Sequence, residues 1–372
     1  MVGPGWRNGA GIAGAAVGVA AGVALERLTA GRGVRRRARL ALDAQSPFGS
    51  LRGAPGTAVA DDGTELYYEV EEARAPLPAP QSSLRGRLLR RRPPDPLTVV
   101  FSHGYCLNQD SWHYQRAALR GAVRAVYWDQ RCHGRSARGC AQRDGAPLTM
   151  DQLGRDLKAV IDAAAPTGPL VLVGHSMGGM TVMALAAQYP DLVRERVVGA
   201  AFVSTSAGRL SEISFGLPVV GVNAVRRVLP GLLRALGKQA ELVERGRRAT
   251  ADFTASLVKR YSFGSQEVDP AVARFAERLI GATPIDVVAE FYPAFTDHDK
   301  AAALPVFGRV PVLVLAGERD LITPVEHSRA VAAVLPEARL EIVPDAGHLV
   351  ILEHPEVVNA RLIELLPLGG AG

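Results

Sequence analysis

The sequence predicts an α/β protein with a mostly parallel central sheet, helices on both faces and a helical cap insertion late in the chain. Short apolar runs rich in β-branched residues alternate with helical stretches from about residue 98 onward, which is the pattern of a parallel sheet. The alternation breaks between residues 209 and 300. A chain of 372 residues is long enough for one large core with such an insertion.

The first elements of the predicted core form a hairpin. Residues 57–70 (TAVADDGTELYYEV) surround Asp62-Gly63, a dipeptide that favours a tight turn between two strands. Residues 71–96 are rich in Pro, Ala and Arg, have no consistent period and are predicted to form a surface loop.

The remaining strands and helices follow from the apolar pattern. Strands are expected at Thr98–Ser102, Ala125–Trp128, Leu170–Val173, Val197–Val203, Pro311–Ala316 and Leu340–Val343. Helices are expected between them, at Asp151–Ala164, Met180–Tyr189, Val325–Val334 and Pro355–Leu365. The strand segments are short, continuous apolar runs, as in strands buried on both faces.

The break in the alternation divides the predicted domain. Residues 46–208 and 301–367 form the two parts of the expected core, and residues 209–300 form a helical lid over the strand ends. Apolar stretches lie within this insertion, at Phe215–Val222, Leu229–Leu236 and Ile280–Val288. Such stretches suit a lid over a lipid substrate, and they equally suit the core of the lid itself.

Residues 1–45 contain a candidate membrane segment. Residues 8–25 carry no charge, are rich in Ala and Gly, and place glycines four residues apart on one helical face. An arginine cluster follows at residues 32–39, so the positive-inside rule places the rest of the chain in the cytoplasm. We therefore expect a membrane-associated protein with its main domain in the cytoplasm. The alternative is a soluble cytoplasmic protein with a peripheral Ala/Gly-rich segment.

Charge and cysteine content argue against several other classes of protein. The net charge is +6, but arginines cluster at 32–39 and 85–92, outside the predicted core and with few aromatic residues between them. Membrane phosphates are therefore a better partner than nucleic acid. Cys106, Cys132 and Cys140 have neither metal-ligand spacing nor the even number of a disulfide framework. No metal or other cofactor is expected.

The stretch LVLVGHSMGGMTVM (170–183) places a serine between a buried strand and a helix. Gly174 and Gly178 tolerate the crowding of so tight a turn, because they have no Cβ. The turn would present the Ser176 hydroxyl beside the backbone N–H of Met177 at the helix N-terminus. A hydroxyl next to such a donor is the start of an acyl-transfer site, although a G-x-S-x-G motif alone also occurs by chance.

Two later strand ends supply the partners that a nucleophilic serine needs. Asp320 follows the strand VPVLVLA within GERD, and His348 follows the strand LEIV within PDAGH. The carboxyl ends of parallel strands face one crevice. Ser176, Asp320 and His348 are therefore predicted to meet there as nucleophile, orienting acid and general base. Glu318 is a weaker candidate for the acid, and Asp320 could instead cap the following helix.

The loop after the strand Thr98–Ser102 is expected to complete the site. Gly104 permits a sharp turn, so that the backbone N–H of Tyr105 can face that of Met177 and form an oxyanion hole. Gly104 and Trp112 are candidates for the substrate pocket, although for Trp112 ordinary packing is slightly favoured. The other polar side chains are expected to be structural: His175 under the turn, His103 and His133 in loops, Asp129 on backbone donors and His354 on the surface.

Together these segments resemble the α/β-hydrolase superfamily over roughly residues 57–367. The resemblance lies in HGY at 103–105, DQRCHGRS at 129–136, GHSMGG at 174–179, GERD at 317–320 and GH at 347–348. Cys132 departs from it, because relatives often have glycine there. The resemblance implies the α/β-hydrolase fold with a helical cap, a site built on Ser176, Asp320 and His348, and no cofactor.

The serine at the turn implies acyl transfer to water through an acyl-enzyme, with an ester, thioester or amide as substrate. We favour carboxylic or lipid esters, because the insertion is apolar and a candidate membrane segment precedes the core. Alternatives with the same three residues are an aminopeptidase resembling the proline iminopeptidases, a cofactor-free perhydrolase of the bromoperoxidase type and an acyltransferase. A membrane-tethered binding protein is disfavoured, because a binder has no need of all three groups.

Overall fold

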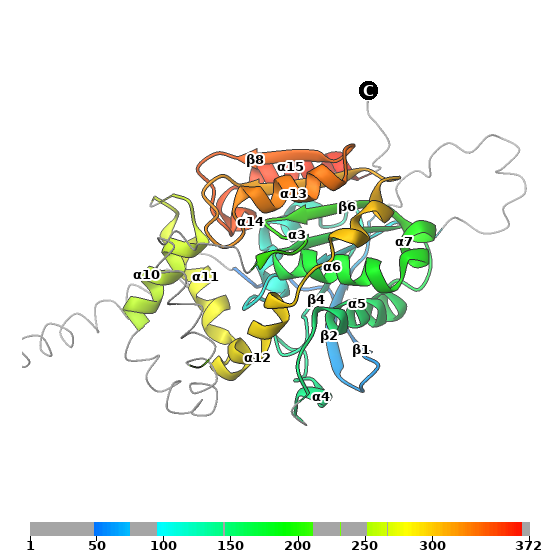
Figure 1. Cartoon of the computed structure of the whole chain (residues 1–372), viewed down its shortest axis with the longest axis horizontal. Coiled ribbons are helices and arrows are strands. Elements are labelled where there is room, and N and C mark those ends of the chain that lie inside the picture. Colours follow the sequence, from blue (N-terminus) through cyan, green and yellow to red (C-terminus); the bar gives the residue numbers. More distant parts are fainter. Residues whose placement is uncertain are drawn as a thin grey trace, which may run out of the picture. The chain divides into compact units, whose positions relative to one another are not determined.

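A largely parallel sheet forms the centre of the described part of the protein in a computed structural model (Figure 1). The structure describes residues 48–74, 95–143, 146–210, 251–265 and 267–366, together with Gly231. Within these residues the sheet has eight strands in the order β1-β2-β4-β3-β5-β6-β7-β8. They are β1 (Ala54–Val59), β2 (Glu65–Glu71), β3 (Thr98–Ser102), β4 (Arg124–Trp128), β5 (Leu170–His175), β6 (Val197–Val203), β7 (Val312–Gly317) and β8 (Arg339–Val343).

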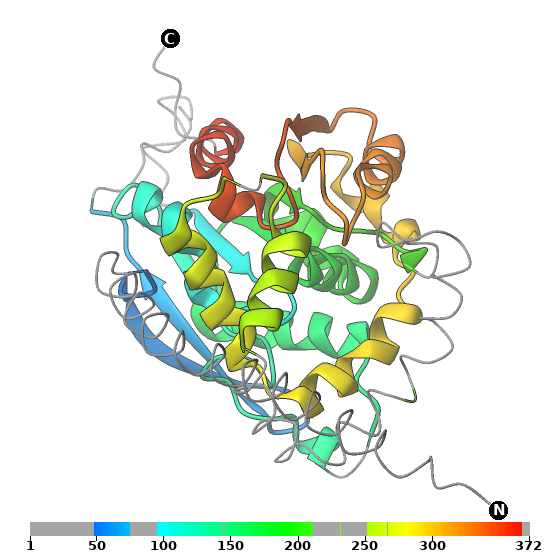
Figure 2. The ribbon, with the colours of Figure 1, turned by 90° about the vertical axis from the view of Figure 1, so that its left-hand side faces the viewer.

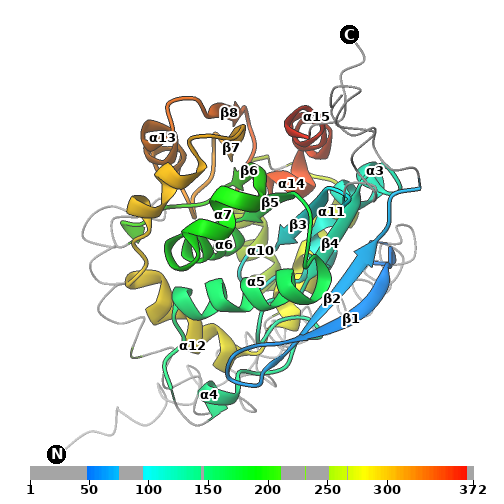
Figure 3. The same ribbon diagram turned by 90° about the vertical axis from the view of Figure 1, so that its right-hand side faces the viewer.

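The hairpin predicted around Asp62-Gly63 is formed by β1 and β2. Val59 pairs with Glu65 in an antiparallel register, and Gly63 adopts a φ of 80°, which glycine accommodates without a steric penalty. β2 pairs antiparallel with β4, and the later strand pairings are parallel. Figure 3 shows the hairpin at one edge of the sheet and β8 at the other. The predicted mostly parallel α/β fold is confirmed.

Helices connect the strands. Before β5 lie η1 (Gln109–Trp112), α3 (His113–Leu119), α4 (Cys140–Arg143) and α5 (Met150–Ala164). Between β5 and β7 lie α6 (Met177–Gln188), α7 (Pro190–Arg196), α10 (Ala251–Ser262), α11 (Pro270–Ala282), α12 (Ile285–Thr296) and η3 (Ala301–Phe307). After β7 come α13 (Val325–Val334), α14 (Val350–Glu353) and α15 (Pro355–Leu365).

Helix α6 begins at Met177, earlier than the predicted start at Met180. Two glycines occupy its first turn, where their low helix propensity disfavours a helix. Tertiary packing overrides that propensity, because the turn lies directly against β3 and the residues after β6. A Cβ on Gly178 would collide with the Ser102 carbonyl, and a Cβ on Gly179 would lie 2.6 Å from Thr205 Oγ1.

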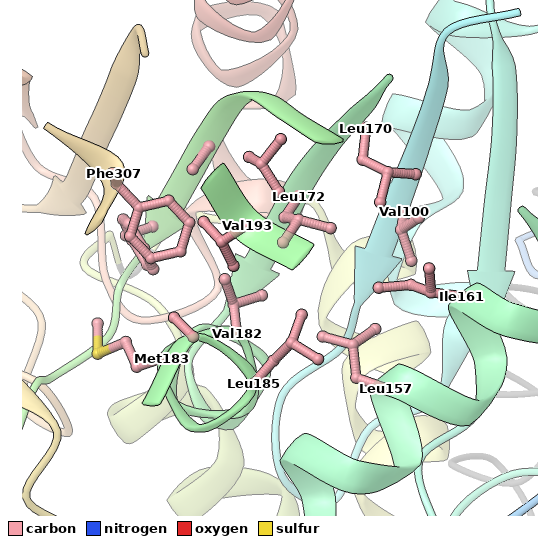
Figure 4. Close-up of a cluster of buried hydrophobic side chains, with 14 of the residues drawn as sticks. Val100, Leu157, Ile161, Leu170, Leu172, Val182, Met183, Leu185, Val193 and Phe307 are labelled. Carbon is pink, nitrogen blue, oxygen red and sulfur yellow. The ribbon is translucent and has the colours of Figure 1, made fainter. Parts of the chain in front are cut away.

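Residues of the parallel strands alternate between two apolar layers. On one face, Val100 and Leu172 pack in a cluster with Leu157 of α5 and Leu185 of α6 (Figure 4). On the other face, Phe101 belongs to a cluster that includes residues of α3, α11 and α15. Burying one such Leu or Phe side chain stabilises the fold by about 1.5–3 kcal/mol. Because both faces are covered, the strands are continuous apolar runs in the sequence.

Helices α10, α11 and α12 come from the segment between β6 and β7. Helices α10 and α11 pack on each other (Figure 2). Helix α12 packs over the start of α6, where its residues Val287, Phe291 and Ala294 share an apolar cluster with Met177 and Met180. The inserted helices therefore reach the carboxyl end of β5, where the candidate nucleophile lies.

Several predicted segments lie outside the described residues. They are the candidate membrane segment 8–25 with its arginine flank, the second arginine cluster at 85–92, and much of the insertion before α10. None of the helices in the described ranges combines the length and apolar character needed to cross a bilayer. The membrane association, and the division of the chain into core and lid at 209–300, stay predictions.

Candidate active site

Ser176 occupies the turn between β5 and α6 in a strained conformation. Its φ is 53° and its ψ is −120°, a combination that non-glycine residues seldom adopt. The surrounding chain holds it there. The Ser176 N–H donates to the Val203 carbonyl at 2.9 Å, and Thr205 Oγ1 donates to the Ser176 carbonyl at 2.6 Å. The end of β6 thus fixes the turn and the direction of its side chain.

The glycines on either side of Ser176 are required by close backbone approach. A Cβ added to Gly174 would lie 2.5 Å from the carbonyl of Gly178. The predicted reason for glycine at these two positions, crowding within a tight turn, is what the structure shows.

Ser176, His348 and Asp320 lie together at the carboxyl ends of β5, β8 and β7. His348 Nε2 lies 2.9 Å from Ser176 Oγ, and His348 Nδ1 lies 2.8 Å from Asp320 Oδ2. An ionised carboxylate only accepts hydrogen bonds, so His348 donates from Nδ1 and its Nε2 lone pair faces the hydroxyl. The side chains of His348 and Asp320 are 7% and 0% exposed. The structure therefore brings the three predicted side chains into one buried, hydrogen-bonded chain.

The Asp320 carboxylate is held as an anion by its neighbours. Its Oδ1 accepts the backbone N–H of Ile322 at 2.8 Å and of Thr323 at 2.9 Å, and its Oδ2 accepts Thr323 Oγ1 at 2.9 Å. Burial alone would raise the pKa of Asp320. The electrostatic attraction and hydrogen bond of the His348 ring, together with the two N–H donors, instead hold that pKa below its ordinary value. Thr323, which sequence reasoning missed, also lies 3.3 Å from His348 Nδ1.

Glu318, the weaker candidate for the acid, is exposed, and its backbone N–H donates to the Val343 carbonyl at 2.9 Å. Asp320 does not cap α13, because the N-cap residue of that helix is Pro324. Its local role is to hold the turn before the helix, where it accepts the N–H groups of Ile322 and Thr323, and it also faces His348. The two roles are compatible, since the N–H donors use Oδ1 and His348 uses Oδ2.

The predicted oxyanion donors lie on adjacent strand ends. Ser102 of β3 pairs with Gly174 of β5, and Tyr105 and Met177 each follow one of these paired residues closely. Within the described ranges, no hydrogen bond engages the backbone N–H of either residue. Both donors are therefore available to a ligand, and their use as an oxyanion hole stays a prediction.

The Tyr105 side chain links this loop to the inserted helix α12. Its hydroxyl donates to the Val288 carbonyl at 2.6 Å, and its ring lies 5.6 Å from Phe291 and 5.0 Å from Phe295 between centroids. On the opposite side of α12, Arg138 forms ion pairs with the carboxylates of Asp286 and Glu290. Helix α12 is thus bound to the core beside the candidate site, and the cluster between them is apolar.

Trp112 is a packing residue, not a wall of an open pocket. It has 0% exposure, and its ring centroid lies 5.1 Å from that of Phe101 and 6.3 Å from that of His175. The η1 turn directs the indole into the apolar layer behind the site, which corrects its candidacy for the substrate pocket. Gly104, the other pocket candidate, is also in close contact with His175, because a Cβ there would lie 2.7 Å from His175 Nδ1.

Three buried histidines have structural hydrogen bonds. His103 Nε2 accepts a backbone N–H at 2.9 Å, and His133 Nε2 accepts another at 3.2 Å. His175 Nε2 donates to the carbonyl of His348 at 2.9 Å. Burial lowers the pKa of His133 to about 4 and of His175 to about 3, and it holds that of His103 well below the ordinary value. All three are therefore neutral at pH 7, in the structural roles expected from the sequence.

These histidines should make the fold sensitive to acid. Their folded pKa values are depressed, so below pH ~6.5 the unfolded chain binds protons that the folded chain does not, and stability falls as pH falls. Each contributes up to about 1.4 kcal/mol per pH unit. Burial raises the pKa of Asp129 to about 6. The folded chain therefore takes up a proton at Asp129 that the unfolded chain does not, which offsets the effect of one histidine on the slope. Together, these three histidines and Asp129 should therefore lower the free energy of unfolding by roughly 3 kcal/mol per unit between pH 6 and 5.

Urea unfolding followed by circular dichroism at graded pH measures this slope. His175→Gln, whose amide can still donate to the His348 carbonyl, should reduce the slope by up to about 1.4 kcal/mol per unit. His354→Gln, the same change at a partly exposed position, is the control with which the slope of His175→Gln is compared. A constant free energy of unfolding between pH 7 and 5 would show that the buried histidines are not the acid-sensitive groups.

The loop DQRCHGRS is shaped by Asp129 and by a strained cysteine. Asp129 accepts the backbone N–H of Gln109 at 2.7 Å and of Arg135 at 2.9 Å, as predicted. Cys132 has a φ of 65°, a left-handed conformation that favours glycine, so the departure from the family pattern is accommodated at the cost of local strain. Burial raises the pKa of the Cys132 thiol, which keeps it protonated and poorly nucleophilic.

No group of His, Cys, Asp and Glu within the described ranges is arranged to hold a metal ion. Cys106, Cys132 and Cys140 form no disulfide bond with one another.

The chain is similar to known proteins in both sequence and fold. The profile of the alpha/beta hydrolase fold matches residues 98–355. A curated relative, "Putative carbamate hydrolase RutD" from Caulobacter sp. (strain K31), is 28% identical over 273 residues, which are 73% of this chain and 91% of the relative. The dihydrolipoyllysine-residue acetyltransferase component of the acetoin cleaving system of Pseudomonas putida is 29% identical over 311 residues, 81% of this chain and 73% of that protein. Among solved structures, a thermophilic esterase from Thermogutta terrifontis aligns with a TM-score of 0.60 at 25% identity, over 83% of this chain and 97% of that chain.

Proposed function

The chain belongs to the alpha/beta hydrolase fold family, and we propose that it is a serine hydrolase that cleaves carboxylic esters through an acyl-enzyme on Ser176. The observation that carries this proposal is the hydrogen-bonded chain from Ser176 through His348 to Asp320. A hydroxyl becomes a useful nucleophile only when an adjacent base accepts its proton. In this proposal His348 is that base and Asp320 is the group that orients it.

In the first step, Ser176 Oγ attacks the ester carbonyl carbon while His348 Nε2 takes the hydroxyl proton. The carbonyl oxygen becomes an oxyanion beside the backbone N–H groups of Tyr105 and Met177. The C–O bond to the alcohol then breaks, and His348 gives its proton to the leaving oxygen. Water repeats the sequence on the acyl-enzyme, which releases the acid and restores Ser176.

The surroundings of Ser176 support a substrate with an apolar acyl group. Helix α12, Met177, Met180 and Tyr105 form an apolar cluster directly beside the nucleophile. Ser176 and His348 are each 6% exposed, so a substrate reaches them within an enclosed and largely apolar site. Charged acyl groups would be desolvated there without a partner, at a cost of several kcal/mol.

A panel of activated substrates tests the proposal. We expect hydrolysis of p-nitrophenyl acetate, butyrate, octanoate and palmitate, with kcat/KM for the best ester at least about 100-fold above that for the p-nitroanilide with the same acyl group. An aminoacyl p-nitroanilide and an aryl carbamate complete the panel. The carbamate is included because of the carbamate hydrolase relative.

Three rival functions each have their own outcome. Preference for the aminoacyl anilide would favour an aminopeptidase, and preference for the carbamate would favour the activity named for the relative. Faster release of p-nitrophenol when an alcohol or thiol acceptor is added, with acylated acceptor as product, would favour an acyltransferase. Absence of turnover and of labelling by a fluorophosphonate would contradict the enzyme proposal altogether.

A further inference from the structure

Glu353, at the end of α14, binds the backbone of two segments that are distant in sequence. Its carboxylate accepts the N–H of Gly264 (3.0 Å to each oxygen), Ser265 (2.8 Å) and Gly347 (2.7 Å). Gly264 and Ser265 follow the inserted helix α10, whereas Gly347 directly precedes His348. One half-buried carboxylate thus ties the inserted segment to the loop that carries the base.

The two segments also touch through their main chains. The Leu349 N–H donates to the carbonyl of Ser262, the last residue of α10, at 2.8 Å. A Cβ added to Gly347 would lie 2.5 Å from the backbone nitrogen of Gly264. At such separations neither segment can shift alone, because close-packed groups transmit displacement to their neighbours.

We propose that Glu353 is a positioning residue, which fixes His348 against Ser176 by clamping the turn after α10 to the His348 loop. A carboxylate accepts all three N–H groups, whereas an amide would place its own donor against some of them. The inference rests on the proposed function, since it assigns Glu353 a part in the reaction of Ser176. It also makes the inserted segment a support of the catalytic base.

The strength of the effect follows from geometry. The base must lie within hydrogen-bond reach of the nucleophile, and the Ser176–His348 contact is 2.9 Å. A displacement of about 1 Å from a remote change can cost about 100-fold in rate. Loosening the His348 loop should therefore lower turnover without changing the apolar surface that binds the acyl group.

Glu353→Gln tests the proposal in the full-length enzyme. We expect kcat on the best p-nitrophenyl ester to fall roughly 10- to 100-fold, with KM within about threefold of wild type. The rate constant for labelling of Ser176 by a fluorophosphonate should fall in parallel. Circular dichroism and end-point labelling give the number of folded sites, by which this rate constant is normalised. Glu353→Asp, which keeps the charge on a shorter stem, should be intermediate. Glu356→Gln, the same change at an exposed glutamate nearby, is the matched control and should behave as wild type.

The outcomes separate this inference from the proposed function. If the wild-type enzyme is not labelled at Ser176, the proposed function fails. If it is labelled and Glu353→Gln reacts at the wild-type rate per folded site, only the positioning role fails, even where the melting temperature falls. Failure of both Glu353 variants to yield folded enzyme would also overturn that role, because the carboxylate would then serve the fold as a whole.

Discussion

Ser176→Ala should lower turnover on the best ester by about a million-fold while leaving the fold unchanged. The hydroxyl that is removed lies 2.9 Å from His348 Nε2, and under the proposed mechanism no acyl-enzyme forms without it. Alanine keeps the Cβ, so the backbone with a φ of 53° has the same steric surroundings as in the wild type. Initial rates, fluorophosphonate labelling and circular dichroism measure activity, the nucleophile and the fold separately.

Ser206→Ala is the matched control, because Ser206 is another buried serine beside a histidine. Its Oγ lies 2.8 Å from His327 Nδ1 and donates to the Gly208 carbonyl at 2.6 Å. The bond to a carbonyl uses the proton that a nucleophile would give up, so we expect activity near that of the wild type. More than about one per cent of wild-type turnover in clean Ser176→Ala enzyme would defeat the assignment. If Ser206→Ala lost activity instead, the nucleophile would have been assigned to the wrong serine.

The apolar pattern predicted the strands because helices cover both faces of the sheet. Each residue of β3 and β5 is buried, so the strands appear in the sequence as continuous apolar runs whose ends are marked by polar or glycine residues. Val197–Val203 and Val325–Val334 have the predicted bounds. Asp320 and His348 could be placed beside Ser176 from the same strands, since each lies in the loop after a parallel strand.

The supporting groups could not be predicted in this way, because their partners are set by tertiary contacts. Thr205 and Thr323 bond to the serine and aspartate regions from loops without a recognisable motif. Glu353 reaches a turn 89 residues away in sequence. For Trp112 the sequence favours packing only slightly, because an aromatic residue in the loop after a strand can face a pocket or the core, and the direction of η1 decides between them.

Asp320→Asn should lower turnover by roughly ten-thousand-fold, with little change in the fold. The amide has the shape of the carboxylate, and its oxygen can still accept the N–H groups of Ile322 and Thr323. Its NH₂ group then faces His348 Nδ1, which must become the acceptor. The imidazole proton moves to Nε2, directly opposite Ser176 Oγ, and the base can no longer take the hydroxyl proton.

Glu318→Gln is the control for this variant. Glu318 is on the same loop but exposed, so its neutralisation should leave kcat near the wild-type value. Comparing kcat and KM for the two variants on one ester separates the orientation of His348 from substrate binding. Only the orientation of His348 requires Asp320, so Asp320→Asn should change kcat and not KM. A near-normal Asp320→Asn with an inactive Glu318→Gln would show that the carboxylate 2.8 Å from His348 is not the one that orients it during the reaction. The loop would then have to rearrange in the substrate complex, and the Oδ1 hydrogen bonds that hold Asp320 in place are what oppose such a rearrangement.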